Sequence, residues 1–194
     1  VKNSIIAKKY DFDYWDGSRR TGYGGYKYIK GYWKGMAEQL IKDYKLRAGS
    51  KVLDVGCGKA FLLHEMKLIE PNLNITGFDI SDYALKHNTK LTKPYVYNQK
   101  AEEPFKYKDK EIDLVISINT LHNLKFFNLK KAILEINRVG KQAYIVVESY
   151  RNEEELFNLE CWALTIESFF SVVEWEWIYD EFNYTGDYEF IFFE

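Results

Sequence analysis

The chain has 194 residues, 46% of them hydrophobic and 29% charged, with a formal net charge of −2. This balance is typical of one soluble globular domain, so we expect a single domain over residues 1–194. No overall field would draw such a chain to nucleic acid or to a membrane. Two cysteines supply neither a disulfide framework nor a metal-binding spacing. Without a signal peptide or a long apolar run, we expect the cytoplasm as the location. The sequence leaves both a monomer and a homodimer open.

The first 35 residues have few aliphatic side chains and many Gly, Tyr, Lys and Arg. The stretch "DFDYWDGSRRTGYGGYKYIKGYWKG" has no helical or strand period, and its glycines permit tight turns. A flexible tail is one interpretation, but disordered segments are poor in aromatic residues. We therefore expect this N-terminal arm to be ordered, at least when a ligand is bound.

The rest of the chain alternates short apolar strands with amphipathic helices. Strands are expected at 52–55, at 75–80, in "YVYN", at 113–118, at 143–147 and in the closing "DYEFIFF". Helices are expected at 32–46, 61–69, from the N-cap Ser81 to about Thr89, 129–138, 152–164 and 172–181. The alternation predicts an α/β fold, a doubly wound and mostly parallel sheet of six or seven strands with helices on both faces. Within it, residues 1–46 form the arm and its helix, and 47–194 form a cofactor-binding core.

The stretch "KVLDVGCGKAF" reads as a strand that runs into a glycine turn. A dinucleotide fingerprint would need a third glycine where Phe61 stands. A phosphate-binding loop would need Ser or Thr after Lys59, but Ala60 follows. Both phosphate interpretations are therefore disfavoured.

Two carboxylates come at the tips of the first two strands. Asp54 stands two residues before Gly56, where it would repel a pyrophosphate and attract an ammonium group. Asp79 ends the second strand, where a carboxylate can accept both hydroxyls of a ribose. A ligand with an amino acid end, a ribose end and no phosphate fits, and S-adenosyl-L-methionine is such a ligand. The plainer alternative is that Asp79 only caps a helix and the glycines only make a tight turn.

The motifs "VLDVGCGKAF", "ITGFDIS" and "DLVISINTLHNL" resemble, in this order, those of class I S-adenosylmethionine-dependent methyltransferases. The resemblance covers residues 50 to about 150. It implies S-adenosyl-L-methionine as cofactor, S-adenosyl-L-homocysteine as product, and a sheet of order 3-2-1-4-5-7-6 whose last strand is antiparallel. The tail offers only one clear strand after the fifth, so one of the seven is missing or cryptic.

The resemblance also implies a set of cofactor-binding residues. They are Asp54, Gly56, Cys57 and Gly58 at the methionine end, Asp79 at the ribose, Ile80, Ala101 and Glu102 at the adenine, and Asn119 facing the cofactor. The chain departs from the family pattern in two places. Ala60 replaces the commonest third glycine, and Gln99-Lys100 stands where many members have Gly-Asp.

Residues for the methyl acceptor are expected on both sides of this core. His122, just after the fourth strand, is the candidate catalytic base, with structural support as the alternative. The other two histidines fall within helical patterns. The candidate acceptor-binding residues are Arg19, Arg20, Tyr23 and Tyr26 in the arm and Glu148, Tyr150 and Arg151 after the fifth strand. The arm would then close over the site as a lid.

The sequence thus favours a methyltransferase that acts on an oxygen, less readily on a nitrogen, of a small acceptor. Chains with a similar tyrosine–glycine arm resemble methyltransferases of bacterial surface-glycan gene sets, which suggests polysaccharide biosynthesis and a sugar-, nucleotide- or phosphoryl-containing acceptor. A catalytically silent binding module that serves as an assembly partner is the alternative. A nicotinamide oxidoreductase is disfavoured by Phe61.

Overall fold

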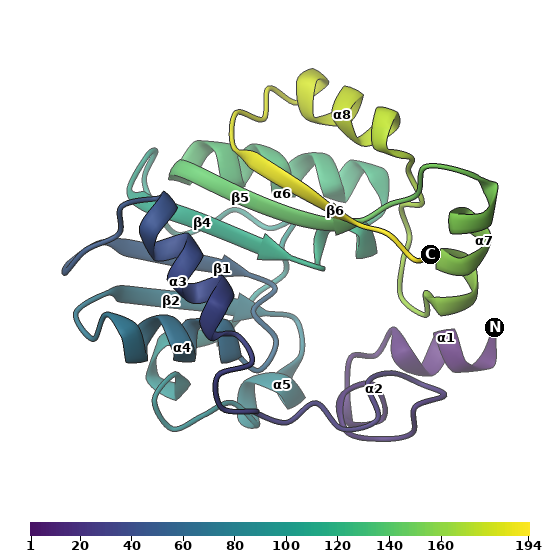
Figure 1. Ribbon diagram of the computed structural model, residues 1–194, viewed down its shortest axis with the longest axis horizontal. Coiled ribbons are helices and arrows are strands. Elements are labelled where there is room, and N and C mark those ends of the chain that lie inside the picture. The colour runs from purple at the N-terminus through teal and green to yellow at the C-terminus, as the bar shows by residue number, and fades with distance from the viewer.

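The computed structural model describes residues 1–194, which form one parallel sheet with helices packed around it (Figure 1). The strands are β1 Lys51–Val55, β2 Asn74–Asp79, β3 Val96–Asn98, β4 Ile112–Ile118, β5 Gly140–Glu148 and β6 Asp187–Ile191. Each lies where an apolar run predicted a strand. Buried parallel strands read as apolar runs because both of their faces are covered.

The helices also follow the predicted order. They are α1 Lys2–Ala7, α2 Phe12–Trp15, α3 Lys34–Asp43, α4 Phe61–Ile69, α5 Asp82–Lys86, α6 Phe126–Val139, α7 Glu153–Trp162 and α8 Val172–Glu181, with 3-10 turns η1 Lys93–Tyr95 and η2 Leu121–Asn123. The bounds of α4 and α8 are those predicted. The Ser81 hydroxyl accepts the N–H of Ala84 at 3.0 Å, which confirms the predicted N-cap of α5.

The six strands are all parallel, in the order β3-β2-β1-β4-β5-β6. The α/β doubly wound fold is therefore confirmed. Chain order reverses between β1 and β4, where the crossovers leave in opposite directions. In open parallel sheets, the crevice beyond the carboxyl ends of such strands is where ligands bind.

The seven-stranded order implied by the resemblance is wrong for this chain. β6 pairs directly with β5 in parallel, from Tyr144 opposite Asp187 to Glu148 opposite Ile191. No antiparallel strand lies between them. The edge of β5 that an inserted strand would need is already hydrogen-bonded to β6, so the sheet stays all-parallel.

Helices cover both faces of the sheet. On one face α6 and α8 bury Ile133 and Trp175 among side chains of β1, β4 and β5. On the other, α3 and α4 bury Leu40 and Met66 against a second set of strand side chains that includes Leu114. None of the eight helices has both the length and the apolar character needed to cross a bilayer.

The arm lies at the carboxyl ends of the strands, with α1 beside α7 (Figure 1). The Ser4 hydroxyl donates to the carbonyl of Leu164 at 2.7 Å, and the Lys8 ammonium lies 2.7 Å from the Glu167 carboxylate. Periodicity did not predict α1 or α2, because six and four residues are too few to show a helical repeat. The arm thus packs against the end of the sheet at which the strands have their carboxyl ends.

Candidate active site

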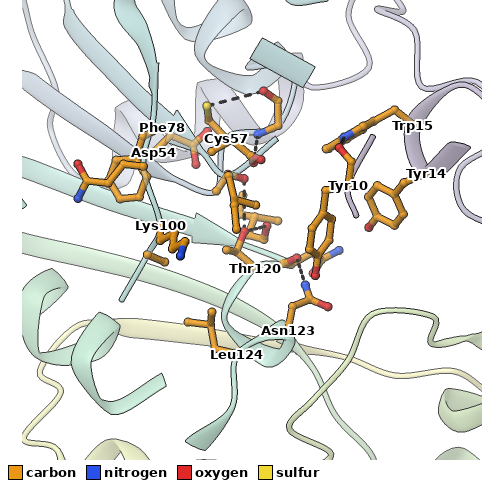
Figure 2. A pocket seen from close by; sticks show the side chains of 18 of the residues that line it. Tyr10, Tyr14, Trp15, Asp54, Cys57, Phe78, Lys100, Thr120, Asn123 and Leu124 are labelled. Atoms are coloured by element: carbon orange, nitrogen blue, oxygen red, sulfur yellow. Dashed lines mark hydrogen bonds between the residues drawn. The ribbon is translucent and has the colours of Figure 1, made fainter. Parts of the chain in front are cut away.

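A cavity of about 440 Å³ opens at the carboxyl ends of the strands, at the point where chain order reverses. The glycine turn and the ends of β1, β2 and β4 form one side of it. The arm forms the other, and Figure 2 shows Tyr10, Tyr14 and Trp15 facing Asp54 and Cys57 across the space. Two segments far apart in the sequence therefore share one cavity.

The glycine turn has no room for larger side chains. Gly56 has a φ of +77°, and a Cβ there would lie 2.1 Å from the Thr120 hydroxyl oxygen. Gly58 has a φ of +53°, and a Cβ there would lie 2.7 Å from the Trp15 ring. Both positions combine a left-handed backbone with close approach of a neighbour, which only glycine accommodates without strain.

Asp54 brings an unpaired carboxylate into the cavity wall. Its side chain is 5% exposed, and no hydrogen bond reaches it. Burial, together with the charge of Asp79, raises the pKa of Asp54 from 3.8 to about 7. An uncompensated buried carboxylate of this kind is a site for a cationic group.

Asp79 is held in place by the backbone around it. Its two carboxylate oxygens accept the N–H groups of Gly58 and Ser81, each at 2.8 Å. Burial raises the pKa of Asp79, although these N–H groups act in the opposite direction. Since each carboxylate oxygen has a second lone pair, Asp79 can still accept hydroxyl groups from a ligand.

The arm supplies an aromatic wall. Trp15 donates its indole N–H to the Ser81 hydroxyl at 2.9 Å and stacks on Tyr23 at a centroid distance of 5.5 Å. Tyr26 stacks on Phe61 of α4 at 5.2 Å. Burial raises the pKa of Tyr14 to about 12, so its phenol is neutral at physiological pH. The wall is therefore apolar in bulk with neutral hydroxyl groups at its edge.

The segment after β4 forms the floor. Asn119 lies in the left-handed region with a φ of +53°, and its side-chain oxygen is buried without a hydrogen-bond partner. Asn123 donates its amide N–H to the Asn119 carbonyl at 3.2 Å, while its own side-chain oxygen is also unpartnered. Buried polar atoms are almost always paired, so two free amide oxygens in one cavity indicate a polar ligand.

A family model described as "Methyltransferase domain" matches residues 46–186. The chain belongs to the methyltransferase domain family. The match starts in the segment before β1 and ends just before β6, so it contains the turn, both carboxylates and the floor. Family membership and fold imply S-adenosylmethionine as the cofactor.

Two curated proteins are similar to a large part of the chain. The methyltransferase domain is 32% identical over 127 residues to the uncharacterized protein MJ1252 of Methanocaldococcus jannaschii, covering 65% of this chain and 47% of that protein. It is 26% identical over 125 residues to a Thermoplasma acidophilum protein named "Probable cobalt-precorrin-6B C(15)-methyltransferase (decarboxylating)", covering 60% of this chain and 61% of that one. The chain thus spans about half the length of these curated relatives.

Among solved structures, the YcgJ protein of Bacillus subtilis has the same fold. It superposes with a TM-score of 0.62 and 19% sequence identity, over 76% of this chain and 67% of that one. At this identity the likeness concerns the arrangement of strands and helices alone.

The residues of the cavity fit S-adenosylmethionine. The free Asp54 carboxylate suits the ammonium of the methionine end, and Asp79 has lone pairs left for ribose hydroxyls. The glycine cradle that a Cβ would fill leaves room for a ligand to approach the backbone. No cationic side chain of the turn faces the cavity to meet a phosphate, because the one lysine there is bound elsewhere.

All nine residues predicted for the cofactor line this one cavity. They are Asp54, Gly56, Cys57, Gly58, Asp79, Ile80, Ala101, Glu102 and Asn119. Their roles toward the cofactor remain predictions. Burial raises the pKa of the Cys57 thiol well above its usual value, so this side chain stays a neutral part of the wall.

Only some of the residues predicted for the acceptor lie at the cavity. Tyr23 and Tyr26 line the cavity, and the other five do not. Arg19 lies over the Trp162 ring at 5.0 Å, and Arg20 is exposed. Arg151 pairs with Glu155 and Glu194. Tyr150 forms a bridge to Ser171, and the Glu148 carboxylate lies near the ring of His122.

His122 lies behind the floor rather than on it. Its Nδ1 accepts the backbone N–H of Glu148 at 3.0 Å, and its Nε2 lies 3.8 Å from the Glu148 carboxylate. Burial lowers the pKa of His122 to about 3 and raises that of Glu148 to about 7. The ring is therefore neutral, with its proton on Nε2 toward Glu148.

Sequence reasoning did not single out several residues that the fold brings to the cavity. They are Tyr10, Tyr14, Trp33, Thr120, Asn123, Lys125, Asn128 and Glu167. For Thr120 and Asn123 a signal existed, since both lie in the motif "NTLHNL" beyond β4. For Tyr10 and Tyr14 there was none, because their positions depend on contacts with distant segments.

Proposed function

We propose that the chain transfers a methyl group from S-adenosylmethionine to an oxygen, less readily a nitrogen, of a small acceptor. The observation that carries this proposal is the shared cavity. Its sheet side offers two buried carboxylates and a glycine cradle, and its arm side offers an aromatic wall. A ligand bound at the sheet side would meet a second molecule under the arm.

S-adenosylmethionine, when bound, supplies an electrophilic methyl group on a sulfonium sulfur. The chain's own residues would bind, orient and exclude water. Asp54 would hold the amino acid end, Asp79 the ribose, and Ile80 with Ala101 and Glu102 the base. The arm, residues 1–46 with its helix, would serve as the substrate lid over a core of residues 47–194.

For the acceptor we favour an oxygen that is already anionic, such as that of a phosphoryl group on a sugar or nucleotide. Such an oxygen needs no general base, and the only cationic side chains in the lining are Lys100 and Lys125. We infer that these two lysines, rather than Arg19 and Arg20, would bind the negative charge of the acceptor. An acceptor from surface-polysaccharide biosynthesis has this chemistry and remains our preferred setting.

His122 as catalytic base stays a prediction. Its ring does not line the cavity, which argues against contact with the acceptor. Its pKa is lowered to about 3, which argues against proton uptake near neutral pH. Replacement by alanine tests the role. Loss of turnover with intact cofactor binding would support it, and near-full activity would exclude it.

Calorimetric titration with S-adenosylmethionine and S-adenosylhomocysteine tests the function itself. Binding in the micromolar range, followed by methyl transfer to a panel of phosphorylated sugars and nucleotides, supports the enzyme. Binding of neither molecule by the folded chain would instead favour a silent binding module that acts as an assembly partner.

A further inference from the structure

Lys59 follows the glycine turn directly, yet its ammonium does not point to the cavity. The side chain is 3% exposed. Its Nζ lies 2.8 and 2.7 Å from the two carboxylate oxygens of Asp16, and donates to the carbonyl of Tyr26 at 2.7 Å. All three acceptors belong to the arm, and together they use the three N–H donors of the ammonium.

Asp16 is fixed in turn by its surroundings. Besides Lys59, its carboxylate accepts the Tyr83 hydroxyl at 2.8 Å and the backbone N–H of Tyr26 at 3.0 Å. The Asp16 carboxylate therefore connects the glycine turn, α5 and the part of the arm around Tyr26. A charged pair that is largely out of water is costly to break by removing one partner, because the other charge is left unpaired.

The pair sits between the two arm residues that touch the cofactor side of the cavity. Trp15, next to Asp16 in sequence, lies against Gly58, and Tyr26 stacks on Phe61. A second contact lies further along the arm, where Glu65 of α4 accepts the Tyr28 hydroxyl at 2.6 Å and the N–H of Gly31 at 2.9 Å. These contacts with the cofactor turn and with α4 add to those that the arm makes with Leu164, Glu167 and Ser81.

We propose that Lys59 is a positioning residue that holds the arm closed over the cofactor: its ion pair with Asp16 keeps Trp15 and Tyr26 on the glycine turn, and the cofactor enters and leaves when this pair opens. This role of Lys59 rests on the proposed binding of S-adenosylmethionine in the cavity. The attachment at Glu65 keeps residues 28–31 in place, so the opening movement belongs to the residues before them.

The test uses the full chain with Lys59→Met, Asp16→Asn and the double variant. The exposed Lys42 of α3 makes no ion pair, so Lys42→Met is the matched control. Two rates are measured. One is trypsin cleavage at Arg19 and Arg20, which are exposed within the arm. The other is dissociation of S-adenosylhomocysteine, followed by stopped-flow tryptophan fluorescence.

We expect each single variant to raise both rates about tenfold or more. The double variant should raise them no further than either single variant, because all three variants remove the same ion pair. The control should match the parent. Variants that retain cooperative unfolding but keep both rates within about twofold of the parent would overturn the proposal, as would faster cleavage with unchanged dissociation. If the parent binds no cofactor, the proposed function and the gating fail together, and the cleavage rates alone then decide whether Lys59 holds the arm.

Discussion

Replacement of Asp54 by asparagine should stabilise the free protein and weaken cofactor binding at the same time. The substitution keeps the shape of the side chain and removes its charge. In the folded chain that charge is buried, without a hydrogen-bond partner and near Asp79, which raises the pKa of Asp54 from 3.8 to about 7. Ionised Asp54 therefore opposes folding.

The size and sign follow from the two pKa values. Because the folded-state pKa is the higher one, stability is lost as the pH rises from about 4 to about 7. At about 1.36 kcal/mol per pH unit between the two pKa values, the cost of the buried charge is on the order of 4 kcal/mol at pH 8. At pH 5 Asp54 of the folded chain is largely protonated, so only the part of the cost between pH 3.8 and pH 5 applies, which is less than half of the cost at pH 8.

Urea unfolding of parent and variant at pH 5 and pH 8 measures this difference. We expect Asp54→Asn to raise the free energy of unfolding at pH 8 and to lose more than half of that gain at pH 5. Asp113→Asn is a control of opposite sign. Burial of Asp113 is outweighed by Lys141 and the N–H of Lys51, which lower its pKa, so this variant should lose stability. A gain at Asp54 that is absent, or equal at both pH values, would refute the reasoning.

Asp54→Asn should also bind S-adenosylmethionine about a hundredfold more weakly than the parent at pH 8, since a hydrogen bond to a charged group contributes about 1.5–3 kcal/mol. For the parent, affinity should fall as the pH drops below about 7, where Asp54 takes up a proton. Calorimetry over this pH range checks both statements.

Four further substitutions, one of them a control, test the turn and its neighbours. Gly56→Ala should abolish cofactor binding and cost about 1–3 kcal/mol, because its Cβ would lie 2.1 Å from a threonine oxygen. Gly49→Ala, also at positive φ but in open space, should cost about 1 kcal/mol and leave binding unchanged. Ala60→Gly should change stability by less than about 1 kcal/mol, because relief of a φ of +55° offsets a lost buried methyl group. Ser81→Ala removes a helix cap and one of the two acceptors of the Trp15 indole N–H, the other being the Tyr10 carbonyl, so it should cost about 1–2 kcal/mol and shift tryptophan fluorescence. Urea unfolding and calorimetry provide the measurements.

The core of the fold could be predicted because its signals are local. Apolar runs mark the strands, and the period of α4 and α8 sets their bounds. The positions of Asp54 and Asp79 at strand tips then follow from the parallel sheet, whose carboxyl ends share one edge. This is why all the predicted cofactor residues meet in one cavity.

The arm could not be predicted in the same way. Asp16 and Lys59 are 43 positions apart, and nothing near either residue indicates the other. Arginine side chains in a glycine-rich stretch do not reveal which way they point, and Arg19 and Arg20 turn away from the cavity. The position of His122 depends on the short turn η2, which places its ring behind the floor rather than in it.

The charges at the two ends of the turn explain how one short motif can serve both binding and closure. Asp54, before the glycines, has no partner in the free chain, so its desolvation cost is recovered only when a cation binds. Lys59, after the glycines, has its full set of partners, all of them in the arm. A cofactor whose amino acid end binds Asp54 thus contacts the same short turn from which Lys59 binds the arm. Cofactor occupancy and arm closure should therefore be thermodynamically linked: by reciprocity, the factor by which bound cofactor favours the closed arm equals the factor by which closure favours cofactor binding.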